Sequence, residues 1–130
     1  MIVLDTHIWL WWVHRQFERL TPALLQHVEQ ADRLAIAAIS CFEVAWLERH
    51  GRIDLLIPRR DWFRLALEGA GIECLTLSAA IASRAVDLPE HHRDPQDRII
   101  IATALEHKTQ LMSLDREFVR YSELTGSLLS

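Results

Sequence analysis

Short, uninterrupted apolar runs alternate along this chain with segments that begin on helix-capping residues. The runs lie at residues 2–4, 34–39, 72–77 and 110–114. Strands that are apolar at every position are buried on both faces, which is typical of a parallel sheet covered by helices. The alternation therefore predicts an α/β fold, a parallel sheet with helices on both faces. We expect four strands, and the leucines at 124, 128 and 129 could add a fifth at the edge.

Capping residues mark where the predicted helices begin. Thr21 before Pro22 predicts a helix that runs to about residue 32. Ser40 and Glu43 have the spacing of a capping box and predict a helix that ends near Gly51. Further helices are expected at 61–69, from Ser78 to just before Pro89, from Asp94 through 105, and briefly after Asp115.

Length and cysteine content indicate one self-sufficient domain. The 130 residues are half hydrophobic and a quarter charged, as in an ordinary globular domain spanning 1–130. Cys41 and Cys74 have no metal-binding spacing, so we expect reduced thiols and a cytoplasmic protein. No apolar stretch approaches the roughly 20 residues of a membrane span, and the first residues do not form a signal peptide. We therefore expect no membrane association.

The net charge of −4 excludes a protein that binds nucleic acid through overall charge alone. Any RNA contact has to be local. The candidate RNA-binding residues are Arg15, Arg49, Arg52 and Arg98.

Four acidic residues stand where one predicted element meets the next. Asp5 follows the first apolar run and Asp115 the last, while Glu43 and Asp97 fall in the first turns of helices. Each has a local explanation, because carboxylates cap helices and stabilise their N-terminal ends. In a parallel sheet, however, these junctions lie at one edge, where α/β folds build their ligand sites. The four side chains are therefore predicted to meet.

Carboxylates gathered in this way repel one another, and helix N-termini offset only about 0.3–1 kcal/mol each. A divalent cation would relieve the repulsion. Ligation by carboxylate oxygens alone suits Mg²⁺ or Mn²⁺ rather than zinc. Such a site can activate water for attack on a phosphodiester.

Four segments together resemble the PIN domain, and most closely its VapC-type toxins. They are residues 1–12 (MIVLDTHIWLWW), Ser40-x-x-Glu43, residues 92–98 (HRDPQDR) and 113–115 (SLD). They occur in the family's order and spacing and extend over nearly the whole chain. Gln96 departs from the pattern, since an aromatic residue is commoner there, and the C-terminus lacks a clear closing strand.

This resemblance implies a Mg²⁺-dependent endoribonuclease that is the toxin of a type II toxin–antitoxin pair. It also implies a homodimer and a small antitoxin that lays a helix near the acids and blocks them. The family's catalytic acids fall on Asp5, Glu43, Asp97 and Asp115. An additional acid falls on Asp94, and small polar positions on Thr6 and Ser113. We expect Asp5, Asp97 and Asp115 to be metal ligands, whereas Glu43 either binds metal or orients the attacking water.

Three other functions remain open on the sequence. His7, His91 and His92 could serve as acid and base in a metal-free ribonuclease. Asp5 could be the nucleophile of a phosphatase or phosphotransferase, although His7 stands where those enzymes usually carry a second aspartate. The acids could also be helix caps in a non-catalytic interaction module, which would show no Mg²⁺-linked gain in stability.

Residues 7–13 are apolar almost all round the predicted helix and contain three tryptophans, and Trp46 and Leu47 add further apolar surface. A helix of this kind is either fully buried or part of an interface. The second alternative predicts that this surface binds a second copy or an antitoxin segment.

Overall fold

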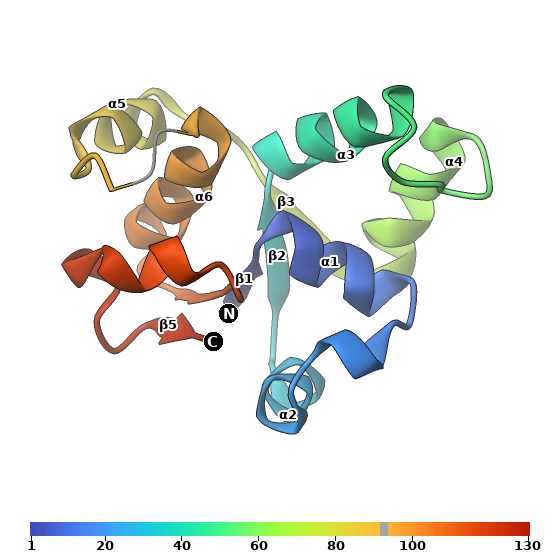
Figure 1. The fold of residues 1–130 in the computed structure, drawn as a ribbon, viewed down its shortest axis with the longest axis horizontal. Coiled ribbons are helices and arrows are strands. Elements are labelled where there is room, and N and C mark those ends of the chain that lie inside the picture. The colour runs from blue at the N-terminus through green and yellow to red at the C-terminus, as the bar shows by residue number, and fades with distance from the viewer. Residues whose placement is uncertain (92–93) are drawn as a thin grey trace.

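A five-stranded parallel sheet forms the centre of the computed structural model, which describes residues 1–91 and 94–130 (Figure 1). The strands are β1 (Ile2–Leu4), β2 (Leu34–Ala37), β3 (Ile72–Leu75), β4 (Gln110–Met112) and β5 (Leu128–Leu129). Their order is β3-β2-β1-β4-β5. β1 pairs in parallel with both neighbours, so that Ile2 lies opposite Leu34 on one side and Gln110 on the other. The predicted parallel α/β sheet is confirmed, with β5 as its fifth strand.

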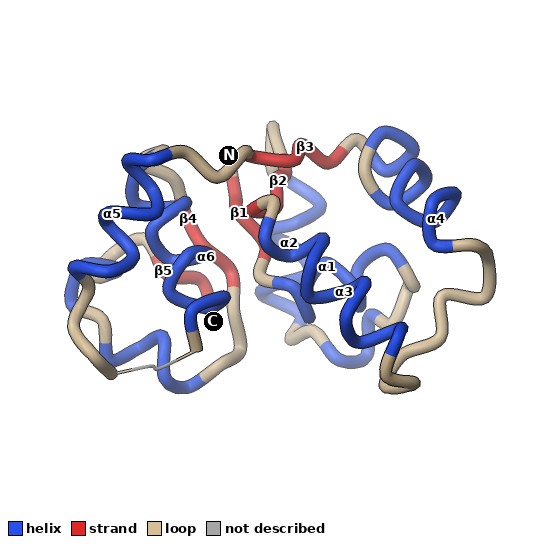
Figure 2. The backbone as a smooth tube through the Cα atoms, turned by 90° about the horizontal axis from the view of Figure 1, so that it is seen from above, coloured by secondary structure: helices blue, strands red, loops and turns tan. Residues whose placement is uncertain are grey.

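Helices cover both faces of this sheet (Figures 1 and 2). One face carries α1 (Thr6–Val13), α2 (Pro22–Gln30) and α4 (Arg59–Ala66), and the other α5 (Ala79–Asp87) and α6 (Pro95–Glu106). The helix after β2, α3 (Ile39–Arg49), contacts both α1 and α6. Short 3₁₀ helices complete the chain at η1 (Phe17–Arg19), η2 (Glu68–Ala70), η3 (Arg116–Arg120) and η4 (Ser122–Leu124).

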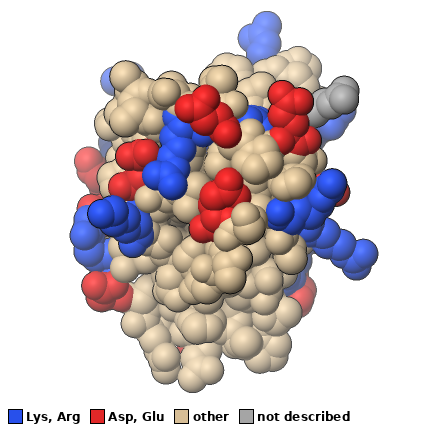
Figure 3. Space-filling model, turned by 90° about the vertical axis from the view of Figure 1, so that its left-hand side faces the viewer, with Lys and Arg blue, Asp and Glu red and all other residues tan. Residues whose placement is uncertain are grey.

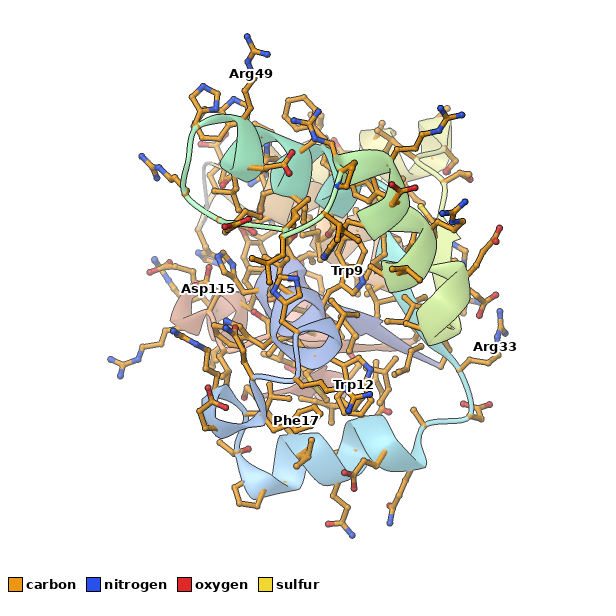
Figure 4. All side chains as sticks on the ribbon, turned by 90° about the vertical axis from the view of Figure 1, so that its right-hand side faces the viewer. Trp9, Trp12, Phe17, Arg33, Arg49 and Asp115 are labelled. Carbon is orange, nitrogen blue, oxygen red and sulfur yellow. The ribbon has the colours of Figure 1, made fainter. Side chains whose placement is uncertain are left out.

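Each central strand contributes side chains to both cores, which explains why the strands are apolar throughout. Ile2 and Leu4 pack in the core beneath α1, α2 and α4, together with Trp9. Val3 points to the other face and packs with residues of α6 and η3. The Trp9 indole is fully buried between α1 and α4, and its Nε1 donates to the Ala66 carbonyl oxygen over 3.1 Å (Figure 4).

Most predicted helix starts are confirmed, but the capping box at Ser40 is wrong. Thr21 and Ser78 accept hydrogen bonds from the backbone N–H groups three residues ahead. At α3 the chain turns directly from β2 into the helix, with Ala38 at the N-cap and no side-chain cap. Ser40 therefore lies inside the first turn, and its hydroxyl bonds Thr6 instead.

The structure also shortens several predicted elements. β2, β3 and β4 end at residues 37, 75 and 112, two residues before the apolar runs do. The final predicted helix is the 3₁₀ helix η3, where Asp115 accepts from the Glu117 N–H over 2.9 Å. Within residues 1–91 and 94–130, no helix has both the length and the apolar character needed to cross a bilayer.

Candidate active site

The candidate site lies at the carboxyl edge of the sheet, between β1 and β4. The strand order reverses at this point, because β1 leads to β2 on one side and pairs with β4 on the other. Parallel sheets open a crevice for ligands where the order reverses. Asp5 directly follows β1, and its N–H donates to the Met112 carbonyl oxygen of β4 over 3.0 Å.

An open pocket of about 600 Å³ occupies this edge. Five carboxylates line it, coming from the end of β1, the N-terminal half of α3, the start of α6 and the segment after β4. Its lining residues are Asp5, Thr6, His7, Trp11, Glu43, Trp46, Leu47, Asp94, Gln96, Asp97, Leu114 and Asp115. The structure thus brings together all four acids predicted to be catalytic, together with Asp94 and Thr6.

Asp5 is the most deeply placed of these acids, with an exposed fraction of 8%. Its carboxylate is the N-cap of α1 and accepts from the Ile8 N–H over 2.9 Å. Burial raises the pKa of Asp5, the hydrogen bonds from Ser113 and Ile8 oppose that rise, and the charge of Asp115 adds to it. Ser113 is itself fully buried, and its hydroxyl accepts from the Asp115 N–H over 3.0 Å. One hydroxyl therefore joins the segments that carry two of the acids.

Glu43 was predicted in the first turn of a helix but lies beyond the first turn of α3, because the helix already begins at Ile39. Burial raises the pKa of Glu43 to about 7, a hydrogen bond with Thr6 opposes this, and the charges of Asp94 and Asp5 add to it. A carboxyl group with a pKa near neutrality can hold or release a proton under physiological conditions. The charge effects show that these carboxylates are close enough to influence one another.

Asp94 and Asp97 enter the pocket from the start of α6. Asp94 is the N-cap and accepts from the Gln96 N–H over 2.9 Å. Asp97 lies in the first turn, where the helix dipole favours a negative charge. Asp94 thus makes a capping hydrogen bond and also lines the pocket, so its position is compatible with both a helix cap and a role at a metal.

Arg98, the next residue of α6, is bound to backbone rather than directed at solvent. Its guanidinium donates to the carbonyl oxygens of Ala85, Val86, Leu88 and Pro89 over 2.7–3.1 Å. It therefore fixes the end of α5 against α6, directly beside Asp97. These bonds favour a structural role over the RNA contact predicted for Arg98.

The other candidate arginines lie at the surface. Arg49 and Arg52 are exposed at the end of α3 and just beyond it, and Arg49 points away from the body of the protein (Figure 4). Arg15 is exposed after the far end of α1 and lines a different pocket. Of the three histidines, His7 lines the acidic pocket and His91 packs edge-on against Tyr121, with ring centroids 5.0 Å apart. His92 lies outside the described residues.

The donor chemistry of the pocket fits a hard divalent cation bound largely through water. In the described parts of the chain, no three His, Cys, Asp or Glu side chains converge closely enough to hold a metal ion by themselves. The available donors are nevertheless carboxylate and hydroxyl oxygens, and Mg²⁺ commonly keeps several waters while binding one or two carboxylates. Burial first, and then neighbouring carboxylates, raise the pKa values of Asp5 and Glu43, and a bound cation would favour their charged forms.

Two parts of the site were missed by the sequence interpretation. The spacing of Ser40 and Glu43 suggested a cap, so the buried contact of Ser40 with Thr6 was not foreseen. Trp11 and Trp46 were considered only as apolar surface, whereas both line the pocket beside the acids. Helical periodicity could have placed Trp46 beside the acids, because Glu43 and Trp46 are three residues apart and so share one face of the helix.

Comparison with known proteins gives one consistent family. The sequence model of the PIN domain matches residues 2–124. Ribonuclease VapC22 of Mycobacterium tuberculosis is 41% identical over 116 residues, which cover 88% of this chain and 87% of that protein.

Solved structures share the fold at much lower identity. VapBC2 from Rickettsia felis, bound to a DNA fragment from its promoter, gives a TM-score of 0.71 at 16% identity, covering 99% of this chain and 98% of that one. A toxin–antitoxin complex from Klebsiella pneumoniae gives a TM-score of 0.66 at 20% identity, covering 100% and 97%.

Proposed function

The chain belongs to the PIN domain family, and on this premise we propose that it is a metal-dependent endoribonuclease that hydrolyses RNA phosphodiester bonds. The observation that carries the proposal is the presence of five carboxylates from four segments in a single pocket. Helix capping accounts for individual acids but gives no reason for them to face one another. The ribonuclease activity in the name of the mycobacterial relative supports the same reaction.

The residues of the pocket divide into two roles. A bound Mg²⁺ or Mn²⁺ would neutralise phosphate charge and activate a water for attack on phosphorus. We assign the binding of that ion to Asp5, Asp97 and Asp115, directly or through water, with Asp94 in support. Glu43, whose pKa lies at about 7, accepts the proton of the attacking water on its carboxylate. Thr6 and Ser113 hold Glu43 and Asp5 through side-chain hydrogen bonds.

Incubation of the purified chain with total RNA, with and without Mg²⁺, tests this proposal. We expect cleavage only with Mg²⁺, and none by the Asp5→Asn variant under the same conditions. Cleavage in the presence of a chelator would contradict it and favour the histidine mechanism.

We further propose that the chain is the toxin of a toxin–antitoxin pair and that an antitoxin segment binds the groove between the end of α1 and α4. This groove has a volume of about 790 Å³ and displays Leu56 and Leu65, with exposed fractions of 85% and 59%. Two non-glycine residues that line it, Arg15 and Leu56, have φ values of 57° and 68°, and such strained backbone clusters at binding sites. The toxin–antitoxin complexes among the structural neighbours support this kind of partner.

A candidate antitoxin should suppress RNA cleavage when it is added to the purified chain. Leu56→Ser and Leu65→Ser should weaken that suppression while leaving cleavage itself unchanged. Suppression that is equally strong with both variants would place the antitoxin elsewhere.

We propose a homodimer as the state in solution. Apolar side chains also remain exposed on the face formed by α5, α6 and η3, led by Val86 and Val119 at 77% and 65%. Charged side chains of both signs are interspersed over the upper part of this face (Figure 3). Light scattering measures the mass, with Val86→Ser and Val119→Ser as probes of this face and Trp11→Ser and Trp12→Ser as probes of α1. A monomer whose two tryptophan variants both unfold would contradict a role of these residues in association.

A cytoplasmic location is proposed as well. Cys41 and Cys74 are both free, and burial raises the pKa of Cys41 to about 12, which keeps that thiol protonated. Free thiols of this kind are typical of reducing compartments. Fractionation of cells that produce the chain tests this expectation.

A further inference from the structure

We propose that Trp11 and Trp46 form a stacking wall that binds an unpaired base of single-stranded RNA beside the acidic pocket. The inference deepens the proposed ribonuclease function, on which it rests, by naming two side chains that position a base of the RNA beside the acids.

The two rings belong to the same pocket as the acids. Trp46 lies one turn after Glu43 on α3, and Trp11 lies one turn after His7 on α1. Residues three or four apart share one face of a helix, so each helix presents an aromatic ring next to a pocket residue. A volume of about 600 Å³ is sufficient for a nucleotide-sized ligand. The wall and the acids can therefore contact neighbouring parts of one strand.

Both rings are held in place before any ligand binds. The His50 ring stacks on the Trp46 indole with centroids 3.9 Å apart and planes at 23°, and His50 Nδ1 lies 2.8 Å from the Trp46 carbonyl oxygen. Trp46 nevertheless keeps an exposed fraction of 43%. Trp11 contacts the His7 ring at 5.9 Å, and the Arg19 guanidinium lies 5.7 Å from its ring centroid. A fixed aromatic surface binds with little loss of side-chain entropy.

Charge determines which part of a nucleotide fits against this wall. The acids repel a phosphate that carries no cation, whereas a base is neutral and offers a flat face to either indole. The flanking phosphates can meet basic side chains outside the pocket, since Arg19 packs on Trp11 and Arg49 lies one turn beyond Trp46. Bases in a duplex are already stacked and paired, so only an unpaired strand can use this wall.

Binding can be measured apart from cleavage. The probe is a fluorescently labelled single-stranded RNA oligonucleotide of mixed sequence, with a perfectly paired RNA duplex of the same strand for comparison. All variants carry Asp97→Asn to prevent cleavage, and anisotropy is recorded. We expect Trp46→Leu to weaken single-strand binding about tenfold, as the loss of one base–aromatic stack does elsewhere. Trp46→Tyr should retain most of the affinity.

Phe42→Leu is the matched control. Phe42 is an exposed aromatic residue of the same helix, at 56%, and does not line the pocket. It should leave binding of the single strand unchanged. Duplex binding should be insensitive to Trp46→Leu. Trp11→Leu provides a second, independent test, and circular dichroism melting establishes that each variant is folded.

The outcomes separate this inference from the proposed function. If wild-type chain cleaves RNA with Mg²⁺ but Trp46→Leu and Trp11→Leu bind the single strand normally, the stacking wall is refuted and the ribonuclease stands. Normal RNA binding together with lost antitoxin suppression would identify the wall as a protein contact. If the wild-type chain cleaves nothing yet Trp46→Leu weakens single-strand binding, the wall stands and the nuclease fails. An Asp97→Asn chain that binds no single-stranded RNA would overturn the inference.

Discussion

The Thr6 and Ser40 hydroxyls are hydrogen-bonded to each other over 2.8 Å, and both residues are buried. This bond joins the first turns of α1 and α3, which lie next to Asp5 and Glu43. Ser40→Ala removes one of the two bonded hydroxyls, so we expect a loss of about 1–2 kcal/mol in the free energy of unfolding. It should also slow RNA cleavage, because Thr6 bonds Glu43 as well.

Ser78→Ala is the control for this variant. Ser78 caps α5 outside the pocket, and its loss should destabilise the fold by about 1 kcal/mol. The free energy of unfolding in denaturant and the rate of RNA cleavage are measured for both variants, and only Ser40→Ala should slow cleavage. Equal cleavage by the two would mean that the hydroxyl pair serves stability alone.

Asp5→Asn and Asp97→Asn should each reduce Mg²⁺-dependent cleavage about 100-fold or more, since changes even around metal ligands reach that size. The fold should persist, because asparagine caps α1 about as well as aspartate does. Melting curves in a chelator should show stability equal to wild type or higher, as one repulsive charge is removed. Full activity in both variants would refute the assigned metal site.

Asp94→Asn separates capping from catalysis at one position. Asparagine can accept the Gln96 N–H bond, so the melting temperature should change little. If Asp94 supports the metal, cleavage should fall about tenfold or more at the same temperature. A variant with both values unchanged would identify Asp94 as a cap only.

Stability without metal should decrease as the pH rises. The pKa of folded Glu43, about 7, lies above its ordinary value of 4.5, so the folded chain binds more protons than the unfolded chain between these pH values. The favourable contribution is complete below pH 4.5 and is lost as the pH rises through about 7. The raised pKa of Asp5 acts in the same direction.

Melting temperatures at pH 5 and pH 8 in a chelator measure this effect, and Glu43→Gln should flatten the dependence. Mg²⁺ added at pH 8 should raise the melting temperature of the wild type more than that of Asp5→Asn. Parallel pH profiles for wild type and Glu43→Gln would show that Glu43 ionises normally.

Arg98→Gln should destabilise the fold by about 2–4 kcal/mol, because several charge-assisted bonds to carbonyl oxygens are lost together. It should leave the salt dependence of RNA binding as it is. Arg49→Gln should have the opposite pair of effects. The slope of the logarithm of the RNA-binding constant against the logarithm of the salt concentration should fall by about one, and the free energy of unfolding should change little. If Arg98→Gln instead reduced this slope and left the fold stable, Arg98 would be an RNA contact, as the sequence predicted.

The sequence was most informative where one local pattern determines the structure. Continuous apolar runs predicted the parallel sheet, and Thr21, Ser78 and Asp94 predicted helix starts, because capping depends on only a few neighbouring atoms. Asp5 and Asp115 could be placed at one edge because parallel strands end together.

Contacts between segments that are distant in the sequence were harder to predict. Ser40 fits a capping pattern, but the turn from β2 buries it against Thr6, which a local pattern does not contain. Arg98 looks like any exposed basic residue until α5 is packed beside α6. β5 is only two residues long and exists through its pairing with β4, so its own sequence carries little signal.

β1 lies in the middle of the sheet although its residues are among the first of the chain, and its neighbour β4 begins only at Gln110. Pairing such distant segments closes a very long loop, and proteins that depend on non-local pairing fold slowly. Asp5 and Asp115 belong to these two segments. A refolding chain should therefore acquire helical signal well before it can cleave RNA, and the time at which cleavage returns reports when the sheet closes.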